Sequence, residues 1–259
     1  MSAPVLVEAR VLGNQEVAPD CRRLVVHAPQ VAGAARPGQF VMVRCGSSWD
    51  PLLRRPFSVA GVDREAGAVT LLFRVVGRGT ALMAGAAPGE TLSLLGPLGR
   101  GFTLPQAPEA TALIGGGMGL APLLFLADEL LAAGCRVWVL AGAGSRTHLF
   151  VPGPAPGCEV LVATEDGSAG TPGPVTVLLP LVGRVRRYYA CGPREMLRAV
   201  AAEMERRGVP GEVCLEERMA CGVGACRGCV CRVRRGEGMA WATVCAEGPV
   251  FPAGEVCWE

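Results

Sequence analysis

The sequence contains no lysine, and all 25 of its basic residues are arginine. Phosphate-binding P-loops and Schiff-base enzymes depend on a lysine, so both classes are excluded. Histidine is nearly absent as well, because only His27 and His148 occur and they lie far apart in the sequence. This scarcity disfavours a Ser-His-Asp hydrolase and a zinc site built from several histidines.

The 259-residue chain also lacks a strong charge and a long hydrophobic run. Its formal net charge is +2, so neither nucleic acid nor an anionic membrane surface is indicated as a partner. No stretch of about 18 uninterrupted apolar residues occurs, and no basic segment leads into an apolar one after Met1. We therefore expect no membrane span, no signal peptide and a cytoplasmic location.

Residues 1–104 have the sequence pattern of a small β barrel. Short apolar or alternating runs rich in Val and Leu are separated by turn signals such as Pro37-Gly38 and Pro88-Gly89. Six strands are predicted, at Val5–Leu12, Arg23–His27, Phe40–Cys45, Phe57–Gly61, Val69–Val76 and Thr91–Leu95. Strands of this number and spacing suit a barrel, and this part is expected to be all-β.

Residues 105–211 alternate between predicted strands and predicted helices. The strands are expected at Thr111–Ile114, Val137–Ala141, Val160–Thr164 and Tyr188–Cys191. The helices are expected from Leu120 to Ala133 and, after Gly192-Pro193, to about Arg207, and a glycine follows each of them. This alternation predicts an α/β domain with an open parallel sheet. The remaining residues, 212–259, are too few to form a core of their own, so we expect a metal centre to hold them.

Twelve cysteines are many for a chain expected in a reducing compartment, where disulfides are rare. Five of them crowd into residues 221–245. The C-x4-C-x2-C…C spacing of a plant-type [2Fe–2S] site is matched by four of these five, Cys221, Cys226, Cys229 and Cys245. The sequence therefore predicts an iron–sulfur site in this segment.

The glycines between these cysteines suit a loop wrapped around a cluster. Gly222, Gly224 and Gly228 allow tight turns that aim backbone N–H groups at sulfur. Cys231 follows Cys229 by two residues and lies outside the C-x4-C-x2-C…C spacing, so it is interpreted as a bystander. The alternative is a structural zinc site with the same thiolates, although zinc ribbons usually carry two C-x2-C knuckles and only one occurs here.

Two segments of the predicted barrel indicate a flavin dinucleotide. Such a ligand needs an arginine for its pyrophosphate, a donor for the isoalloxazine edge and a glycine turn that admits a phosphate closely. The candidate residues are Arg55, Pro56, Phe57 and Ser58, placed at the close of one strand, and Leu72, Phe73, Arg74, Gly79 and Thr80, placed after another. An R-x-x-S tetrad is also common by chance, so Arg55 as a solvated strand end is the alternative.

A glycine-rich turn between a predicted strand and a predicted helix indicates a nucleotide site, because a helix N-terminus can hold a pyrophosphate. The candidate residues are Gly115, Gly116, Gly117 and Gly119. The turn departs from the G-x-G-x-x-G fingerprint, and no acidic residue ends the next predicted strand. That strand runs toward Ser145-Arg146, which could bind a 2′-phosphate. From these residues alone, NAD, NADP and a purely structural turn all stay open.

The order of these three parts resembles the ferredoxin-reductase family. In that family the barrel binds FAD through an R-x-[YF]-[ST] tetrad, and a G-G-x-G-x-A-P turn opens the nicotinamide nucleotide domain. A C-G-P tripeptide near the nicotinamide is matched by Cys191, Gly192 and Pro193. The resemblance implies an FAD-binding barrel at 1–104, an NAD-binding domain at 105–211 and a [2Fe–2S] module at 212–259.

Within this superfamily, the short cluster module is similar to that of the electron-transfer subunits of NAD-dependent (class 1B) dihydroorotate dehydrogenase. The segment Leu215–Cys226 looks like their cluster loop, and Val244–Phe251 looks like their fourth-ligand segment. Cys231 departs from the pattern, which has an apolar residue there. Related transhydrogenase-type subunits, which bifurcate electrons, have an aspartate where Cys221 stands, and Cys221 argues against them.

This resemblance implies an oxidoreductase component rather than a complete enzyme. Electrons would pass from the FMN of a separate catalytic subunit, which oxidises dihydroorotate in pyrimidine (UMP) biosynthesis, through the cluster to FAD and then to NAD⁺. Two copies of each subunit are expected, and no catalytic residue is assigned to this chain. The alternatives are an NAD(P)H reductase subunit that serves a hydrogenase or ferredoxin, and a non-catalytic zinc-stabilised binding module.

Overall fold

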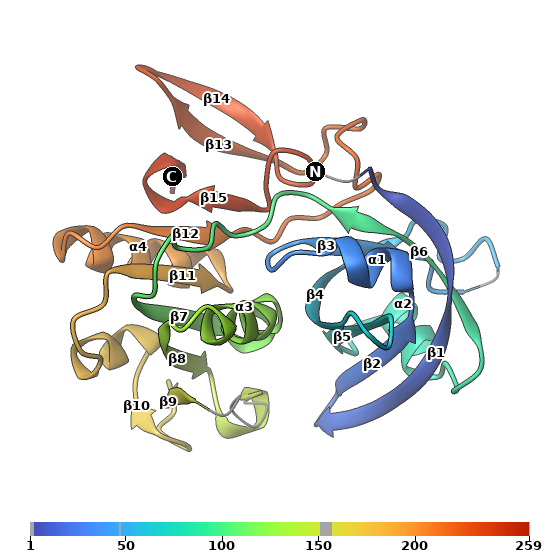
Figure 1. Ribbon diagram of the computed structural model, residues 1–259, viewed down its shortest axis with the longest axis horizontal. Coiled ribbons are helices and arrows are strands. Elements are labelled where there is room, and N and C mark those ends of the chain that lie inside the picture. Colours follow the sequence, from blue (N-terminus) through green and yellow to red (C-terminus); the bar gives the residue numbers. More distant parts are fainter. Residues whose placement is uncertain (1–2, 47, 151–156, 259) are drawn as a thin grey trace.

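The computed structural model describes residues 3–46, 48–150 and 157–258. The first part of the chain is a closed antiparallel barrel with the strand order β1-β2-β5-β4-β3-β6 (Figure 1). Its strands are β1 Val5–Ala18, β2 Cys21–His27, β3 Phe40–Val43, β4 Arg55–Asp63, β5 Ala68–Arg74 and β6 Thr91–Leu98. Each of the six predicted strands overlaps one of these, and the predicted barrel is confirmed.

Two short helices correct the expectation that this part is all-β. They are α1 Pro29–Ala34 and α2 Arg78–Ala84. Neither is long enough to show the 3.6-residue apolar period over a useful window, so the sequence pattern gave no sign of them. Helix α2 begins inside the predicted flavin segment that contains Gly79 and Thr80, and it therefore matters for the site.

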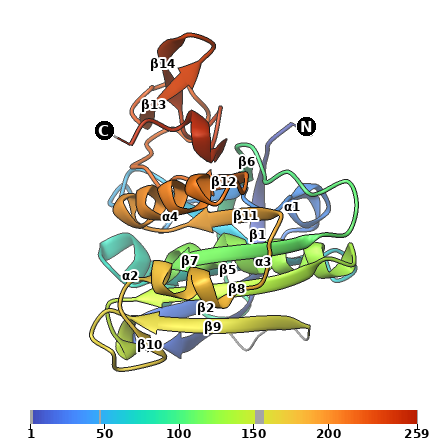
Figure 2. The same cartoon turned by 90° about the vertical axis from the view of Figure 1, so that its left-hand side faces the viewer.

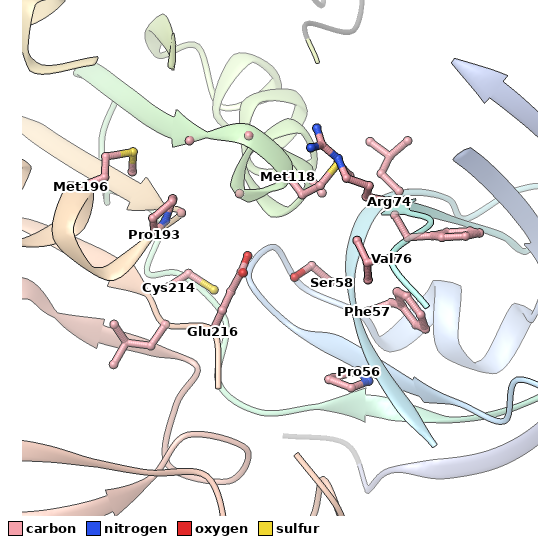
Figure 3. A pocket seen from close by; sticks show the side chains of 18 of the residues that line it. Pro56, Phe57, Ser58, Arg74, Val76, Met118, Pro193, Met196, Cys214 and Glu216 are labelled. Carbon is pink, nitrogen blue, oxygen red and sulfur yellow. The ribbon is translucent and has the colours of Figure 1, made fainter. Parts of the chain in front are cut away.

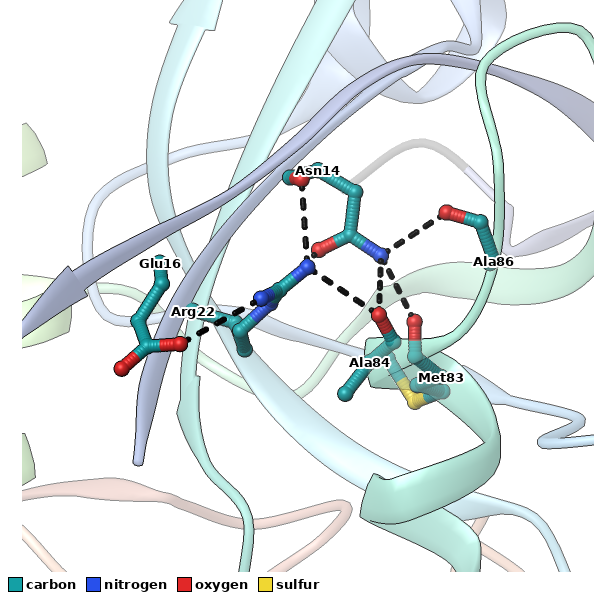
Figure 4. A network of polar contacts seen from close by, with 6 residues as sticks. All are labelled: Asn14, Glu16, Arg22, Met83, Ala84 and Ala86. Carbon is teal, nitrogen blue, oxygen red and sulfur yellow. Dashed lines mark hydrogen bonds and ion pairs between the residues drawn. The ribbon is translucent and has the colours of Figure 1, made fainter. Parts of the chain in front are cut away.

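A hydrogen-bond network anchors the end of α2 to the barrel (Figure 4). The Asn14 side-chain amide of β1 donates to the carbonyl oxygens of Met83, Ala84 and Ala86 at 2.8, 3.2 and 2.9 Å. Arg22 of β2 donates from Nη2 to the Ala84 carbonyl at 3.1 Å. A helix leaves its last carbonyls without intrahelical partners, and these bonds satisfy them.

The second part of the chain is a sheet with the order β10-β9-β8-β7-β11-β12-β15 (Figure 2). Its strands are β7 Ala110–Gly116, β8 Arg136–Ala143, β9 Cys158–Thr164, β10 Thr171–Pro172, β11 Arg187–Cys191, β12 Gly211–Cys214 and β15 Val250–Pro252. All neighbours are parallel except β15, which is antiparallel to β12. The predicted α/β class is confirmed.

Helices α3 Leu120–Ala132 and α4 Arg194–Arg206 cover opposite faces of this sheet. Alternate residues of β7 enter different cores: Leu113 packs with α3 and Ile114 with α4. The chain runs outward from β7 to β8 and β9, then returns to place β11 on the other side of β7. In open α/β sheets, ligands bind at the carboxyl ends of the strands where the order reverses in this way.

Helix α3 also packs against the barrel. Phe125 of α3 is buried in the barrel core, and Arg64 pairs with Glu129 at 2.8 Å. The Arg64 guanidinium lies 5.9 Å from the Phe125 ring centroid. These contacts fix the glycine turn that precedes α3 opposite β4, the strand that carries the flavin tetrad.

The C-terminal segment is tied to the parallel sheet more closely than expected. Strands β12 and β15 are part of that sheet, so the proposed boundary at residue 212 crosses it. Phe251 of β15 is 2% exposed, in the same core as α4. Hydrophobic packing therefore holds this segment in addition to any metal centre.

The β13 Val230–Arg235 and β14 Gly238–Thr243 hairpin projects from one end of the molecule (Figure 1). Its inner side chains, Cys231, Val233 and Ala242, are buried in the core shared with the sheet. None of the helices in the described residues has the length and hydrophobicity needed to cross a lipid bilayer.

Candidate functional site

A cavity of ≈ 1080 Å³ lies between the barrel and the carboxyl ends of the parallel strands. Most small-molecule sites measure about 300–1,000 Å³, so this one has room for a ligand as large as a flavin dinucleotide. The predicted residues that line it are Arg55, Pro56, Phe57, Ser58, Leu72, Phe73, Arg74, Gly79, Thr80, Gly116, Gly117, Gly119, Gly192 and Pro193. Gly115 and Cys191 are not among its lining residues.

The flavin tetrad begins strand β4, whereas the sequence pattern placed it at the close of a strand. Arg55 is half-buried and donates from Nη1 to the Leu53 carbonyl at 2.5 Å. A Cβ on Gly79 would lie 3.4 Å from Arg55 Nε. The two predicted flavin segments therefore meet at this arginine, and a glycine at position 79 keeps the space beside it open.

Thr80 shapes the turn that leads into α2. Its hydroxyl oxygen accepts hydrogen bonds from the backbone N–H groups of Val76 and Gly77 at 2.9 and 3.1 Å, and it donates to the Gly77 carbonyl at 2.9 Å. A hydroxyl engaged in this way holds backbone geometry. Thr80 therefore positions the glycine turn rather than offering a free donor to a ligand.

Arg74 provides the clearest sign that the barrel wall fits an anionic or carbonyl-rich ligand. Its Nη2 donates to the His148 carbonyl at 3.3 Å, but its Nε is buried without a hydrogen-bond partner among the described residues. A buried charged donor without an acceptor is costly, and buried polar groups in native proteins nearly always have partners. A phosphate or flavin carbonyl oxygen would supply the missing acceptor, so these residues fit FAD.

The glycine turn combines an open position with tightly packed ones. Gly117 has φ +54° and nothing within 4 Å of a Cβ built on it, so this position is open to a ligand. A Cβ on Gly119 would lie 2.3 Å from the Cys191 carbonyl oxygen. Gly119 therefore permits the close approach of the β7–α3 turn to the end of β11. The open space at Gly117 supports the ligand-binding interpretation of the turn, and the close packing at Gly119 supports the structural one.

Residues that sequence reasoning did not select complete the far wall of the cavity. Cys214 and Glu216 line it, whereas Cys191 is fully buried behind them and its thiol donates to Glu216 Oε1 at 3.9 Å. Figure 3 shows Glu216 and Ser58 entering the cavity from opposite walls, with Cys214 beside Glu216. The segment Leu215–Cys226 drew attention for its cysteines, and nothing in its pattern marked Glu216 as facing a cavity.

Desolvation and hydrogen bonding shift the pKa values of these groups. The Glu216 side chain is exposed on the cavity wall, and partial desolvation of its carboxyl raises its pKa. The hydrogen bond with Cys214, followed by burial, raises the pKa of Cys191. A buried thiol in such surroundings is unreactive at neutral pH, so Cys191 has the properties of a packing residue.

The four predicted cluster thiols lie in two pairs. The Cys226 N–H donates to Cys221 Sγ, and the Cys245 N–H donates to Cys229 Sγ, both at 3.4 Å. Within the described residues, no three His, Cys, Asp or Glu side chains gather in the manner required by a single metal ion. Two thiol pairs suit a two-iron cluster, in which each iron has two protein ligands, better than a tetrahedral zinc site.

Backbone N–H groups point at these sulfurs, as the glycine content predicts. Gly224 donates to Cys245 Sγ at 3.1 Å, and Cys226 donates to Cys221 Sγ at 3.4 Å. The Cys226 N–H is the main cause that lowers the pKa of Cys221 to about 6. Burial, and then Cys229, raises the pKa of Cys245 to about 12. Metal ligation would stabilise the thiolate of Cys245, so the donor set fits the cluster.

The cluster loop shares a wall with the flavin cavity. A Cβ on Gly222, at φ +73°, would lie 2.6 Å from Met42 Cγ on β3, and Met42 pairs with Pro56 of the tetrad. Met219 lines the cavity two residues before Cys221. The thiols and the flavin wall are therefore separated by little more than one strand and a short loop. Cys231 is 3% exposed on the inner face of the hairpin, in the same core as Cys229 and Cys245.

Family comparisons agree with this division of the chain. A family model described as the iron–sulfur cluster binding domain of dihydroorotate dehydrogenase B matches residues 216–257. Another, described as an oxidoreductase FAD-binding domain, matches residues 8–102. The two matches cover the paired thiols and the barrel.

Several curated proteins are similar over nearly the whole chain. The "Dihydroorotate dehydrogenase B (NAD(+)), electron transfer subunit" of Desulforamulus reducens is 44% identical, covering 97% of this chain and 98% of that protein. The protein of the same name from Geobacillus kaustophilus is 46% identical over 85% of this chain and 86% of its own. Among solved structures, an NADH-dependent reduced ferredoxin-NADP oxidoreductase has a TM-score of 0.85 and 30% identity, covering 97% of this chain and 90% of that one.

Proposed function

Since the chain belongs to the family of electron-transfer subunits of NAD-dependent dihydroorotate dehydrogenase B, we propose that it transfers electrons from an FMN-containing catalytic subunit to NAD⁺. It is an oxidoreductase component with FAD, an iron–sulfur cluster and NAD as cofactors. The proposal extends this to a [2Fe–2S] cluster ligated by Cys221, Cys226, Cys229 and Cys245, and to a complex with two copies of each subunit.

The shared wall between the cluster loop and the flavin cavity is the observation that carries this proposal. When bound, the cluster carries single electrons and FAD exchanges between one-electron and two-electron transfers. Electron transfer between them requires short separation, and the contact of Gly222 with Met42 supports it.

On the barrel side, Arg55 and Arg74 would hold the anionic and carbonyl groups of FAD, and Gly79 would leave room for a phosphate. Support comes from the unpaired Nε of Arg74 and from the proximity of Gly79 to Arg55. Pro56, Phe57, Ser58, Leu72 and Phe73 line the same wall and would pack against the flavin. Thr80 would act by fixing the turn.

On the sheet side, the turn at Gly116–Gly119 would hold the pyrophosphate of NAD. Gly192 and Pro193 would bring the nicotinamide toward Ser58 and the flavin. Gly115 and Cys191 do not line the cavity, so their role would be to pack behind the residues that do. No residue is proposed to act on dihydroorotate itself, since that chemistry belongs to the catalytic subunit.

The test mixes the purified chain, loaded with FAD and iron–sulfur cluster, with an FMN-containing dihydroorotate dehydrogenase catalytic subunit. Dihydroorotate-dependent reduction of NAD⁺ should appear only when both subunits are present. A complex whose mass corresponds to two of each subunit would support the stoichiometry. If the chain oxidises NADH with artificial acceptors but never couples to dihydroorotate, the partner is wrong and a reductase serving another carrier replaces the proposal.

A further inference from the structure

The cavity assigns a direction to a bound nicotinamide dinucleotide. Its nicotinamide must approach the flavin wall at Ser58, near Pro193 and Cys214. The glycine turn at the end of β7 holds the centre of the molecule, so the adenosine half extends toward β8 and β9. The cavity is lined there by Gly142, Gly144, His148 and Glu165.

Two carboxylates follow β9 directly at this end. The Glu165 N–H donates to the Ala143 carbonyl at 3.0 Å, and the Asp166 N–H donates to the Gly144 carbonyl at 3.2 Å. The chain after β9 therefore runs beside the end of β8, where dinucleotide-binding sheets meet the adenosine ribose. The acidic residue that the sequence of β8 lacks is supplied by the neighbouring strand.

The nearby arginine is already engaged. Arg146 donates from its backbone N–H to Ser168 Oγ at 2.7 Å and from Nε to the Ser168 carbonyl at 3.0 Å. Ser168 in turn donates from its backbone N–H and its hydroxyl to Asp166 Oδ1 at 2.9 and 2.6 Å. The Ser168 hydroxyl is the main cause that lowers the pKa of Asp166, so this carboxylate is ionised at neutral pH. Arg74, which donates to the His148 carbonyl, belongs to the flavin wall.

We propose that Glu165, reinforced by Asp166, makes this chain select NAD(H) over NADP(H), and this inference rests on the proposed function. A carboxylate accepts charge-assisted hydrogen bonds from the ribose hydroxyls of NAD. The 2′-phosphate of NADP carries about −1.5 to −2 charges at neutral pH and would be repelled by this carboxylate, which lies on an exposed part of the cavity wall. Arg146 is not among the residues that line the cavity, and its Nε is held by the Ser168 carbonyl.

The experiment compares the affinities of NAD⁺ and NADP⁺ for the full chain loaded with FAD and cluster, measured by calorimetry. The variants are Glu165→Gln, Asp166→Asn and the double variant. Glu159→Gln is the matched control, because Glu159 lies near the start of β9, at the end of that strand away from Glu165, and is paired with Arg136. The wild-type chain should prefer NAD⁺, and Glu165→Gln should shift the ratio of the two dissociation constants toward NADP⁺ by roughly tenfold, with a larger shift in the double variant.

Each result has a defined meaning. A shift in the ratio for the cavity variants and none for Glu159→Gln supports the inference. Equal affinities in the wild type, or an unchanged ratio in the double variant, overturns it while leaving electron transfer to NAD⁺ intact. A wild-type chain that holds FAD but binds neither dinucleotide would overturn the proposed function, and the selectivity with it. Anaerobic reduction of the bound flavin by NADH or NADPH provides a second readout of the same preference.

Discussion

Cys229 and Cys231 stand two residues apart, and both side chains are buried in the same core. Cys229 Sγ accepts a hydrogen bond from the Cys245 N–H at 3.4 Å, whereas Cys231 lies opposite Ala242 in the hairpin. We predict that Cys245→Ser abolishes the cluster, because one iron loses a thiolate ligand, and that Cys231→Ala retains it. Iron content and visible absorbance of the purified variants measure the difference. Loss of iron in Cys231→Ala, with Cys229→Ser still loaded, would assign the third ligand to Cys231 instead.

Glu216 should give the protein a pH-dependent stability. Its pKa is raised above 4.5 in the folded state by desolvation, so the folded chain binds this proton more tightly than the unfolded chain. Its contribution to stability is therefore complete at pH below 4.5 and is lost as the pH rises through the folded pKa. Glutamine imitates the protonated form. We predict that the melting temperature of Glu216→Gln, compared with that of the wild type at the same pH, increases as the pH rises from about 5 to 8.

The effect is expected to be small, since the carboxyl is open to the cavity. Glu195→Gln removes another carboxylate that lines the cavity and is the matched control. Parallel pH profiles for the wild type and Glu216→Gln would contradict the prediction.

At the scale of single residues, sequence patterns identified the clustered cysteines and most of the flavin and glycine-turn residues of the cavity, but not its far wall. Four thiols with a fixed spacing carry their chemistry in the sequence. Glu165, Cys214 and Glu216 face the cavity only because strands distant in sequence align their carboxyl ends, and no local pattern records that alignment. The hydrogen bonds of Arg146 to Ser168 are hidden for the same reason.

At the scale of elements, the strands were predictable because their apolar runs are long and bounded by turns. Helix α2 was missed since its seven residues show no clear period, and its position depends on Asn14 and Arg22 from distant strands. Strands β12 and β15 are short, and each is recognisable only through its partner in the sheet. The local sequence pattern is enough to predict long helices and strands, whereas short ones form through contacts with residues that are distant in the sequence.

The junction of β7 and α3 offers a test at this scale. Gly119→Ala would place a Cβ 2.3 Å from the Cys191 carbonyl oxygen, so the backbone must move. We expect a loss of about 3 kcal/mol in the free energy of unfolding, at the upper end of overpacking costs, and weaker binding of NAD⁺. Gly117→Ala meets no neighbour and carries only the strain of φ +54°, a cost of about 1–2 kcal/mol.

Chemical denaturation of both variants, with dissociation constants for NAD⁺, gives the comparison. A Gly119→Ala variant at least as stable as Gly117→Ala would show that the close approach of the two turns is not required.

At the scale of the whole molecule, the three parts are joined by shared cores rather than by linkers. The barrel residues Phe40 and Met42 lie in the same core as Cys229, Cys245 and the C-terminal strands. Phe125 of α3 enters the barrel core. The sequence suggested three modules in series, and the packing places the cluster loop against both of the other parts. This arrangement brings the cluster to the flavin without a dedicated linker.

The last prediction concerns a chain without its cluster. Cys226→Ser removes an exposed ligand, so the substitution itself disturbs little packing. Because β12 and β15 are held by the sheet and by Phe251, we expect this variant to stay folded, to bind FAD and to accept hydride from NADH, while losing dihydroorotate-coupled activity. Circular dichroism, FAD content and anaerobic flavin reduction measure these properties.

Limited proteolysis locates any loosening in the same variant. New cleavage confined to the loop at 216–229 is the expected pattern, because this loop has few buried residues between the sheet and the hairpin. Loss of FAD together with cooperative unfolding would mean that the cluster stabilises the entire chain, and that the shared hydrophobic core is insufficient. Retention of FAD with loss of coupling would separate the two roles: packing holds the C-terminal segment in place, and the cluster connects it to the partner.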